Sequence, residues 1–252
     1  GWGTILLGGV GMGGQAITVT DDFGSGDTSQ VFSASYFAID ISNPRQPELL
    51  WERSYDGLNF SHVEPVVLKV GDKWFLTFGS GPQTSEGTMT GTDASKIYVV
   101  DLATGEPYSH DGSDDWLFEG DNPRAFMATP ASLDKWLNFT TDAAYFGESY
   151  LPTVGDWQGA VYKLTIPRTD DPINDPPAEA TYEEDPLQWT FHRLFDAPGP
   201  ITGPPALSED FSGNTLIFFG TGRYLNQDDK IDSAEQYLFG IKDPFYNRAF
   251  YE

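Results

Sequence analysis

The chain has 252 residues, a formal net charge of −24 and no cysteine. This charge argues against nucleic acid and anionic membrane surfaces as partners, because both need basic side chains to neutralise phosphate groups. The lack of cysteine excludes disulfide bonds and thiolate metal sites. No apolar run approaches the length of a transmembrane segment, so we expect no membrane insertion in this chain.

Short apolar runs predict strands in four successive groups. The first group comprises residues 4–9, 36–41 and 49–52. The second comprises 64–68, 74–81, 97–105 and 115–118, and the third comprises 129–133, 142–147, 159–166 and 188–191. The fourth comprises 204–207, 216–225 and 236–243. Repeated units of short strands at irregular spacing are typical of β-propeller blades.

The buried runs support this interpretation. Leu216-Ile-Phe-Phe219 is continuously apolar, as expected for a strand that is covered on both faces by neighbouring blades. The sequence therefore predicts an all-β propeller, with a β-sandwich as the alternative. The first group lacks its opening strand and the last ends after its third. We therefore expect residues 1–252 to form a single partial domain, cut mid-blade at both ends and part of a larger ring.

The connections between strands are predicted as surface loops. They include 8–36, 81–93 and the acidic, proline-rich segment 169–185. The glycines near residue 11 are not followed by the helix or the Lys-Ser/Thr pair of a phosphate-binding loop. His62, His110 and His192 lie in no metal-binding spacing, and no G-x-S-x-G motif occurs. The sequence thus predicts no catalytic residues and no enzyme.

One loop, residues 134–142, has the spacing of a cation site. Asp134, Asn138 and Asp142 occupy its first, fifth and ninth positions, and the backbone carbonyl of Thr140 is a further oxygen donor. A calcium loop also carries an oxygen donor at position three and a glycine at position six, where this chain has Trp136 and Phe139. An ordinary hairpin loop is the alternative.

Several strings resemble the C-terminal domain of the PilC/PilY family of type IV pilus tip adhesins. Phe219–Leu225 (FGTGRYL), followed by 228–232 and 236–243, resembles the closing segment of that domain. Gly155–Leu164 (GDWQGAVYKL) resembles an internal strand motif, and residues 5–9, 36–44 and 50–51 resemble the opening segment. The likeness covers the whole chain in the order of the family.

The resemblance implies a modified, quinoprotein-like propeller that is exported to the cell surface and carried at the pilus tip. It implies a role in pilus biogenesis with minor pilins, in control of extension and retraction, and in adhesion to host or abiotic surfaces. The family's loop of D-x-D-x-D-G-x-x-D type binds calcium and regulates the pilus. Carried over by position, the metal ligands are Asp134, Asn138, Thr140 and Asp142. Glu148 and Asp156, in and after an inserted segment 148–154, are candidate additional donors.

Two other functions stay open. Residues 98–105 also resemble the tryptophan-docking repeat of pyrroloquinoline-quinone dehydrogenases, so a quinoprotein fragment is one alternative, and a non-adhesive propeller scaffold is the other. We interpret the repeat as a structural turn in which Asp101 accepts backbone N–H groups and Thr104-Gly105 reverses the chain. Trp116 is then expected to dock between blades.

Overall fold

The computed structural model of the protein describes residues 3–13, 17–20, 30–32, 34–84, 87, 89, 91–170 and 180–243. Four antiparallel sheets follow one another along the chain. The first contains β1 (Ile5–Gly9), β4 (Tyr36–Asp40) and β5 (Glu48–Arg53). The second contains β6 (Val66–Val70), β7 (Lys73–Gly79), β8 (Ala94–Asp101) and β9 (Phe118–Pro123).

The third and fourth sheets complete the fold. The third contains β10 (Ala125–Met127), β11 (Ala131–Leu133), β12 (Ala143–Tyr150), β13 (Gln158–Thr165) and β14 (Thr190–Ala197), with β10 and β11 both pairing with β12. The fourth contains β15 (Ala206–Glu209), β16 (Thr215–Gly220) and β17 (Leu238–Lys242). A separate hairpin is formed by β2 (Ile17–Val19) and β3 (Gln30–Phe32), and the short 3-10 helices are η2 (Pro186–Gln188) and η3 (Asp228–Lys230).

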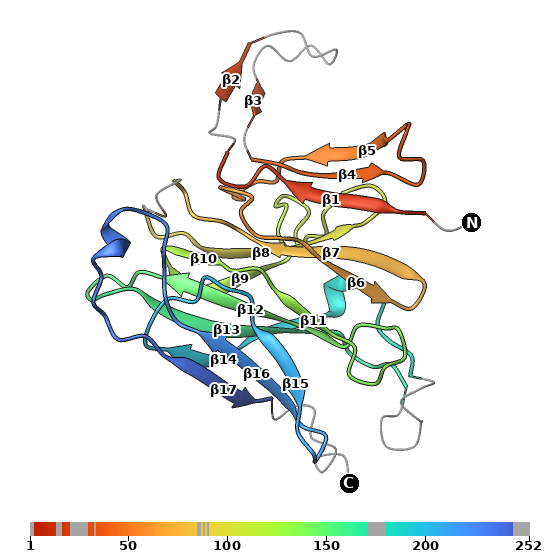
Figure 1. The fold of residues 1–252 in the computed structure, drawn as a ribbon. Helices are drawn as coiled ribbons and strands as arrows, with labels where there is room; N and C mark the ends of the chain where they lie inside the picture. Colours follow the sequence, from red (N-terminus) through yellow and green to blue (C-terminus); the bar gives the residue numbers. More distant parts are fainter. Residues whose placement is uncertain are drawn as a thin grey trace.

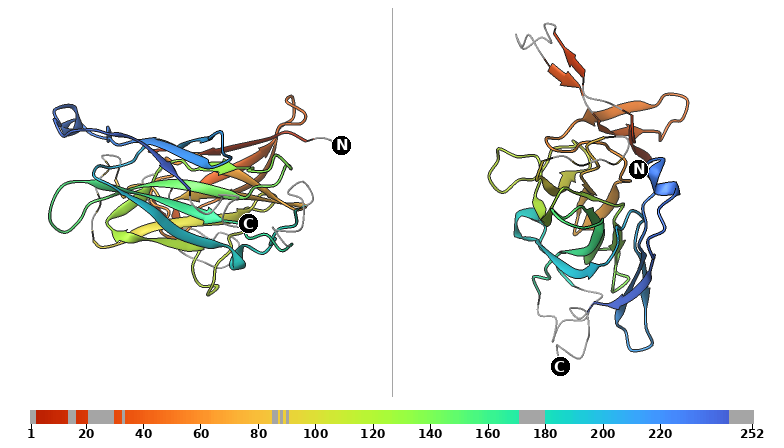
Figure 2. Two further views of the ribbon diagram at one scale, coloured as in Figure 1. Left: turned by 90° about the horizontal axis from the view of Figure 1, so that it is seen from below. Right: turned by 90° about the vertical axis from the view of Figure 1, so that its left-hand side faces the viewer.

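Successive sheets lie face to face with an apolar core between each neighbouring pair (Figure 1). Between the first and second sheets, the rings of Tyr36 and Phe78 have centroids 4.2 Å apart. Between the second and third, Phe75 and Trp189 meet edge to face at 5.2 Å. Ile217 belongs to the core between the third and fourth sheets. Figure 2 shows the sheets following one another in chain order, from the first in red and orange to the fourth in blue.

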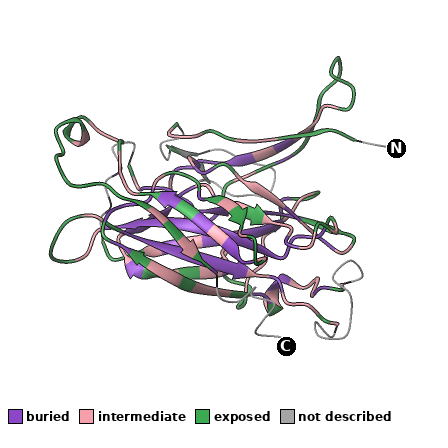
Figure 3. Cartoon of the chain, turned by 60° about the horizontal axis from the view of Figure 1, so that its bottom comes forward, coloured by how far each residue is buried: buried purple, intermediate pink, exposed green. Residues whose placement is uncertain are grey.

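Strands in the middle of this stack of sheets are more deeply buried than strands of the first and last sheets. All eight residues of β12 are buried, as are six of the eight residues of β13. By contrast, β1 and β17 contain only exposed and intermediate residues, and Figure 3 shows the same difference across the molecule. The apolar runs in β12 and β13 therefore belong to a sheet with a neighbour on both faces. Leu216–Phe219, which was expected to be covered on both faces, lies in β16 of the fourth sheet, where burial alternates along the strand and Phe218 is 39% exposed.

The observed strands differ from the predicted ones in several places. The predicted loop 8–36 contains the hairpin β2–β3, and β9 begins at Phe118 rather than at residue 115. The last apolar run ends as a strand at Gly220, so that residues 221–225 belong to a long connection. β12 continues through Tyr150 because its polar residues pair with β13 along the whole length. Of the predicted loop 169–185, residues 171–179 lie outside the described part of the chain.

The turn after β8 has the predicted form. One carboxylate oxygen of Asp101 accepts hydrogen bonds from the backbone N–H groups of residues 103 and 104, each at 2.9 Å, and Gly105 adopts a φ of +70°. Trp116 packs against the core between the first and second sheets, as expected. Trp51 holds the same turn, since its indole N–H donates to the carbonyl of Leu102 at 2.9 Å and its ring fills the space where Gly105 has no side chain.

A buried ion pair joins the third sheet to the residue that follows β17. The ammonium of Lys163 lies 2.6 Å from a carboxylate oxygen of Asp243, and both side chains are fully buried. The hydroxyl of Tyr145 donates to the same oxygen at 2.6 Å. Burial lowers the pKa of Lys163 to about 8 despite the opposing charge of Asp243. Since buried charges are costly unless they are paired, removal of either partner would leave the other uncompensated between the third sheet and the end of β17.

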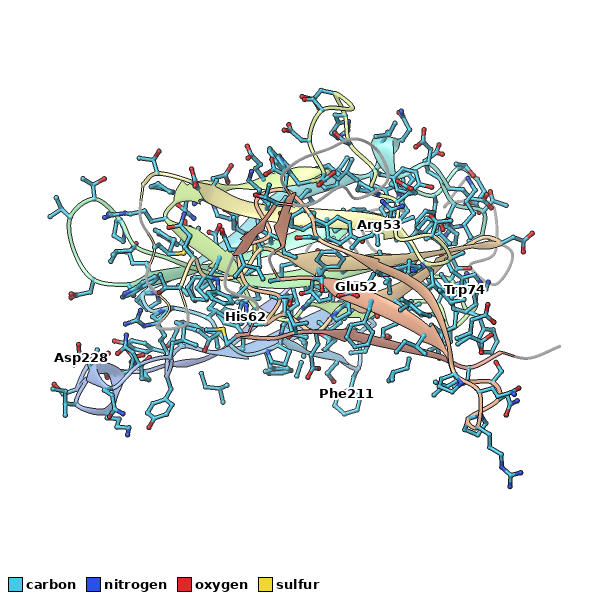
Figure 4. All side chains as sticks on the ribbon, turned by 90° about the horizontal axis from the view of Figure 1, so that it is seen from above. Glu52, Arg53, His62, Trp74, Phe211 and Asp228 are labelled. Atoms are coloured by element: carbon cyan, nitrogen blue, oxygen red, sulfur yellow. The ribbon has the colours of Figure 1, made fainter. Side chains whose placement is uncertain are left out.

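We predict that Trp51→Ala destabilises the protein by about 3–5 kcal/mol, because it removes a large buried ring and the hydrogen bond to the turn after β8. Trp74→Ala is the matched control, since Trp74 lies near the start of β7 and is 47% exposed (Figure 4). The control is expected to cost less than about 1 kcal/mol. Chemical unfolding followed by circular dichroism measures both values, and equal losses would contradict the docking role of Trp51.

Candidate functional site

The loop from Asp134 to Asp142 connects β11 to β12 and is closed by its own backbone. The two carboxylate oxygens of Asp134 accept hydrogen bonds from the N–H groups of Asn138 (3.1 Å) and Phe139 (2.9 Å). The side-chain oxygen of Asn138 accepts from the N–H of Thr140 at 3.0 Å. Asp134 and Asn138, which were predicted as cation ligands, thus accept hydrogen bonds from backbone N–H groups of the same loop.

Two residues of this loop have left-handed backbone conformations. Leu137 has a φ of +54° and Phe139 a φ of +64°, and both side chains are 83% exposed. Such a conformation costs a residue with a Cβ roughly 1–2 kcal/mol. Phe139 therefore has the left-handed backbone conformation that glycine usually adopts at the sixth position of a calcium loop.

Asp142 closes the loop from inside the protein. Its side chain is fully buried, and its two carboxylate oxygens accept hydrogen bonds from the N–H of Lys135 and the hydroxyl of Tyr182, each at 2.7 Å. Burial raises the pKa of Asp142 to about 6, against the lowering effect of these hydrogen bonds. Tyr182 follows the segment outside the described residues and was not singled out in the sequence.

The donor set falls short of what calcium requires. Calcium takes six to eight oxygen ligands, whereas the four carboxylate oxygens and the amide oxygen of this loop already accept hydrogen bonds from N–H or O–H groups. Position three holds the indole of Trp136, a buried N–H donor without a hydrogen-bond partner. In the described ranges, no three acidic, histidine or cysteine side chains are grouped to hold a metal. Calcium binding by Asp134, Asn138, Thr140 and Asp142 stays a prediction.

The two additional donors lie elsewhere. Glu148, the first residue of the segment 148–154, lies in β12, six residues beyond Asp142, which places it about 20 Å further along the strand. Its carboxylate is fully buried and accepts hydrogen bonds from Ser95 (2.5 Å) and Asn122 (2.6 Å) of the second sheet. Asp156 is exposed in the turn between β12 and β13, at the far end of β12 from Asp142.

The residues behind the quinoprotein alternative are engaged in the fold. Asp101 binds its own turn, and the ring of Trp116 carries the ammonium of Lys96 at 3.1 Å from its centroid. The hydrogen bonds of Asp101 fit the interpretation of the 98–105 string as a structural turn.

Two of the strings that carry the family resemblance meet in space. The guanidinium of Arg223, in the connection after β16, lies over the ring of Trp157 at 4.4 Å from its centroid. Arg223 also pairs with Asp229 at 2.6 Å, and Asp229 accepts the N–H of Leu225 at 2.7 Å. Figure 4 shows Asp228 at the far end of this connection, away from the strands. The contact ties a long loop of the fourth sheet to the β12–β13 turn of the third.

Comparison with known proteins identifies one family, whose sequence model matches almost the whole chain. The sequence model described as the PilY1 beta-propeller domain matches residues 1–247. The type IV pilus biogenesis factor PilY1 of Pseudomonas aeruginosa strain PAO1 is 24% identical over 266 residues, which cover 96% of this chain and 19% of that protein. A PilY1 homolog of Xylella fastidiosa strain Temecula1 is 24% identical over 253 residues, covering 96% and 16%. The chain thus spans about a fifth of the length of these curated relatives or less.

The fold has a solved counterpart. The crystal structure of the Pseudomonas aeruginosa PilY1 C-terminal domain superposes with a TM-score of 0.63 at 20% identity, covering 96% of this chain and 50% of that one. The predicted β-propeller fold is confirmed by this match and by the family model. None of the helices in the described part of the chain has the length and apolar character needed to span a bilayer.

The buried carboxyl of Glu148 predicts a pH dependence. Burial raises its pKa from 4.5 to about 7, so the folded protein keeps a proton that the unfolded chain loses between these values. The buried, protonated Glu148 therefore makes its full contribution to the free energy of unfolding below about pH 4.5. This contribution decreases as the pH rises and is lost above about pH 7. We expect Glu148→Gln to gain stability relative to the wild type, by up to about 3 kcal/mol, between about pH 5 and pH 8.

Denaturant unfolding at several pH values measures this gain. Glu64→Gln, at an exposed position, is the matched control. A difference between Glu148→Gln and the wild type that does not change with pH would contradict the prediction.

Proposed function

This chain belongs to the PilY1 beta-propeller domain family, and from that premise we propose that it is the propeller part of a type IV pilus biogenesis factor. The observation that carries the proposal is the family match over residues 1–247, which includes all four sheets. The contact between Arg223 and Trp157 supports it, because it joins two strings typical of the family into one surface.

We place this propeller outside the cell, at the tip of the pilus or at the cell surface, with the minor pilins as its partners. The net charge of −24 supports contact with proteins rather than with anionic polymers. Stacked sheets supply a rigid body, and loops on such a body are common binding elements. The exposed residues Val154, Tyr224 and Ile231, at 88%, 67% and 84%, offer apolar contact in two of these loops.

Adhesion to a host or abiotic surface and control of pilus extension and retraction are the finer roles within this proposal. Both require the propeller to present a contact surface while it stays bound to the pilus. Calcium regulation is a further role that the resemblance implies. Because the 134–142 loop falls short of a calcium donor set, no step of the proposed function passes through calcium.

The first experiment removes the codons of this chain from the chromosomal gene of the bacterium that carries it. We expect surface pilin, sheared from cells and quantified by immunoblot, to fall strongly, and twitching to be lost. The same deletion in a strain with blocked retraction separates the two finer roles: recovered pili indicate that the chain opposes retraction, and continued absence indicates a need in assembly. Normal pili in both strains, with normal twitching in the strain whose retraction is intact, would contradict the proposal.

A point variant tests the surface itself. Arg223→Gln removes the contact with Trp157 and the pair with Asp229, so we expect surface pilin to fall several-fold while the protein still folds. Lys230→Gln is the control, since it removes the same charge at an exposed position of the same loop. Equal pilin levels in both variants would contradict a role for the Arg223 contact. A quinone absorbance in the purified protein would instead favour the quinoprotein alternative.

A further inference from the structure

We infer that the hydroxyl of Tyr182 takes the place of a cation in the 134–142 loop, so that the loop is held closed without calcium. The hydroxyl donates to a carboxylate oxygen of Asp142 at 2.7 Å and accepts from the side-chain nitrogen of Asn138 at 3.4 Å. It therefore bridges the ninth and fifth positions of the loop, which a bound calcium would join. This inference is independent of the pilus role.

The orientation of Asn138 supports the bridge. Its amide nitrogen faces Tyr182, while its amide oxygen accepts the N–H of Thr140 at 3.0 Å. A cation between Asn138 and Asp142 needs the amide oxygen at that point, because calcium binds oxygen and not an N–H donor. The loop is arranged around a hydroxyl group, which can donate to the carboxylate and accept from the amide at the same time.

Tyr182 is fixed well enough to act as a structural bridge. Its side chain is 7% exposed and belongs to the core between the second and third sheets. The backbone around it pairs with the chain that follows β13, through Thr169 N–H to Thr181 carbonyl and Glu183 N–H to Pro167 carbonyl, each at 2.9 Å. The ring therefore reaches Asp142 from a backbone segment that is itself hydrogen-bonded.

The far end of the loop is anchored independently. The N–H of Thr141 donates to the carbonyl of Lys69 at 2.7 Å, and the Thr141 hydroxyl oxygen accepts the N–H of Lys69 at 3.1 Å. Loss of the Tyr182 bridge is therefore expected to open the tip of the loop and leave its junction with β12 in place. The tip carries Leu137 and Phe139, two exposed residues after which chymotrypsin cuts.

The test is limited chymotrypsin digestion of the full chain, with the cut sites identified by mass spectrometry. We expect Tyr182→Phe, which keeps the ring and removes the hydroxyl, to raise the rate of cleavage after Leu137 and Phe139 about tenfold, as loss of a hydrogen bond to a charged group would. Tyr224→Phe is the matched control at an exposed tyrosine and is expected to leave the rate unchanged. Equal cleavage of Tyr182→Phe and wild type would overturn the inference.

Calcium itself provides the second measurement. Wild-type cleavage at these two sites is expected to be the same in chelator, in millimolar calcium and in millimolar magnesium. Protection by calcium but not by magnesium, lost in Asp142→Asn, would overturn the inference and establish the cation site that the family resemblance predicts. Because this readout is local, it stays informative if a variant shifts the stability of the whole protein.

Discussion

The structure depends on sheets that bury both of their faces. Neither the second nor the third sheet has a polar face to turn toward water, since successive side chains of a strand point to opposite sides and those of β12 are buried throughout. Each of these sheets needs an apolar neighbour on either side. Aromatic rings supply much of that contact, as in the stacking of Phe118 of the second sheet on Phe191 of the third, with ring centroids 5.6 Å apart. The loops that carry the candidate sites project from this rigid stack.

The sequence predicted secondary structure correctly where residues within one strand or turn determine it. Continuous apolar runs identified the central strands, and the Asp-x-x-Thr-Gly spacing identified the turn after β8, because both depend on residues close together in the chain. Glu148 was considered as a metal donor because it begins the segment 148–154, which is inserted relative to the family. Its buried position depends on Ser95 and Asn122, which another sheet supplies. A pattern of neighbouring residues in the sequence does not identify hydrogen-bond partners that lie on another sheet.

The candidate loop was likewise predicted only in those features that depend on residues close together in the chain. Its candidate ligands were visible as a spacing, and the structure brings them together in one short connection. The direction in which the amide of Asn138 points was not visible, and neither was Tyr182, which lies forty residues from Asp142. The left-handed conformation at Phe139 was also hidden, since the residue type argues against it. Spacing alone thus gave the outline of the loop but not the group at its centre.

The buried pair of Lys163 and Asp243 has a consequence for the order of folding. Ribosomes and export channels deliver a chain from its N-terminus, so the first three sheets emerge before residue 243. Lys163 is then in place at the centre of the third sheet without the carboxylate that it contacts in the finished fold. Arrival of the last strand supplies that charge. Lys163 is therefore paired with Asp243 only after the chain has been made as far as residue 243, so that the third sheet reaches its final electrostatic state together with the fourth.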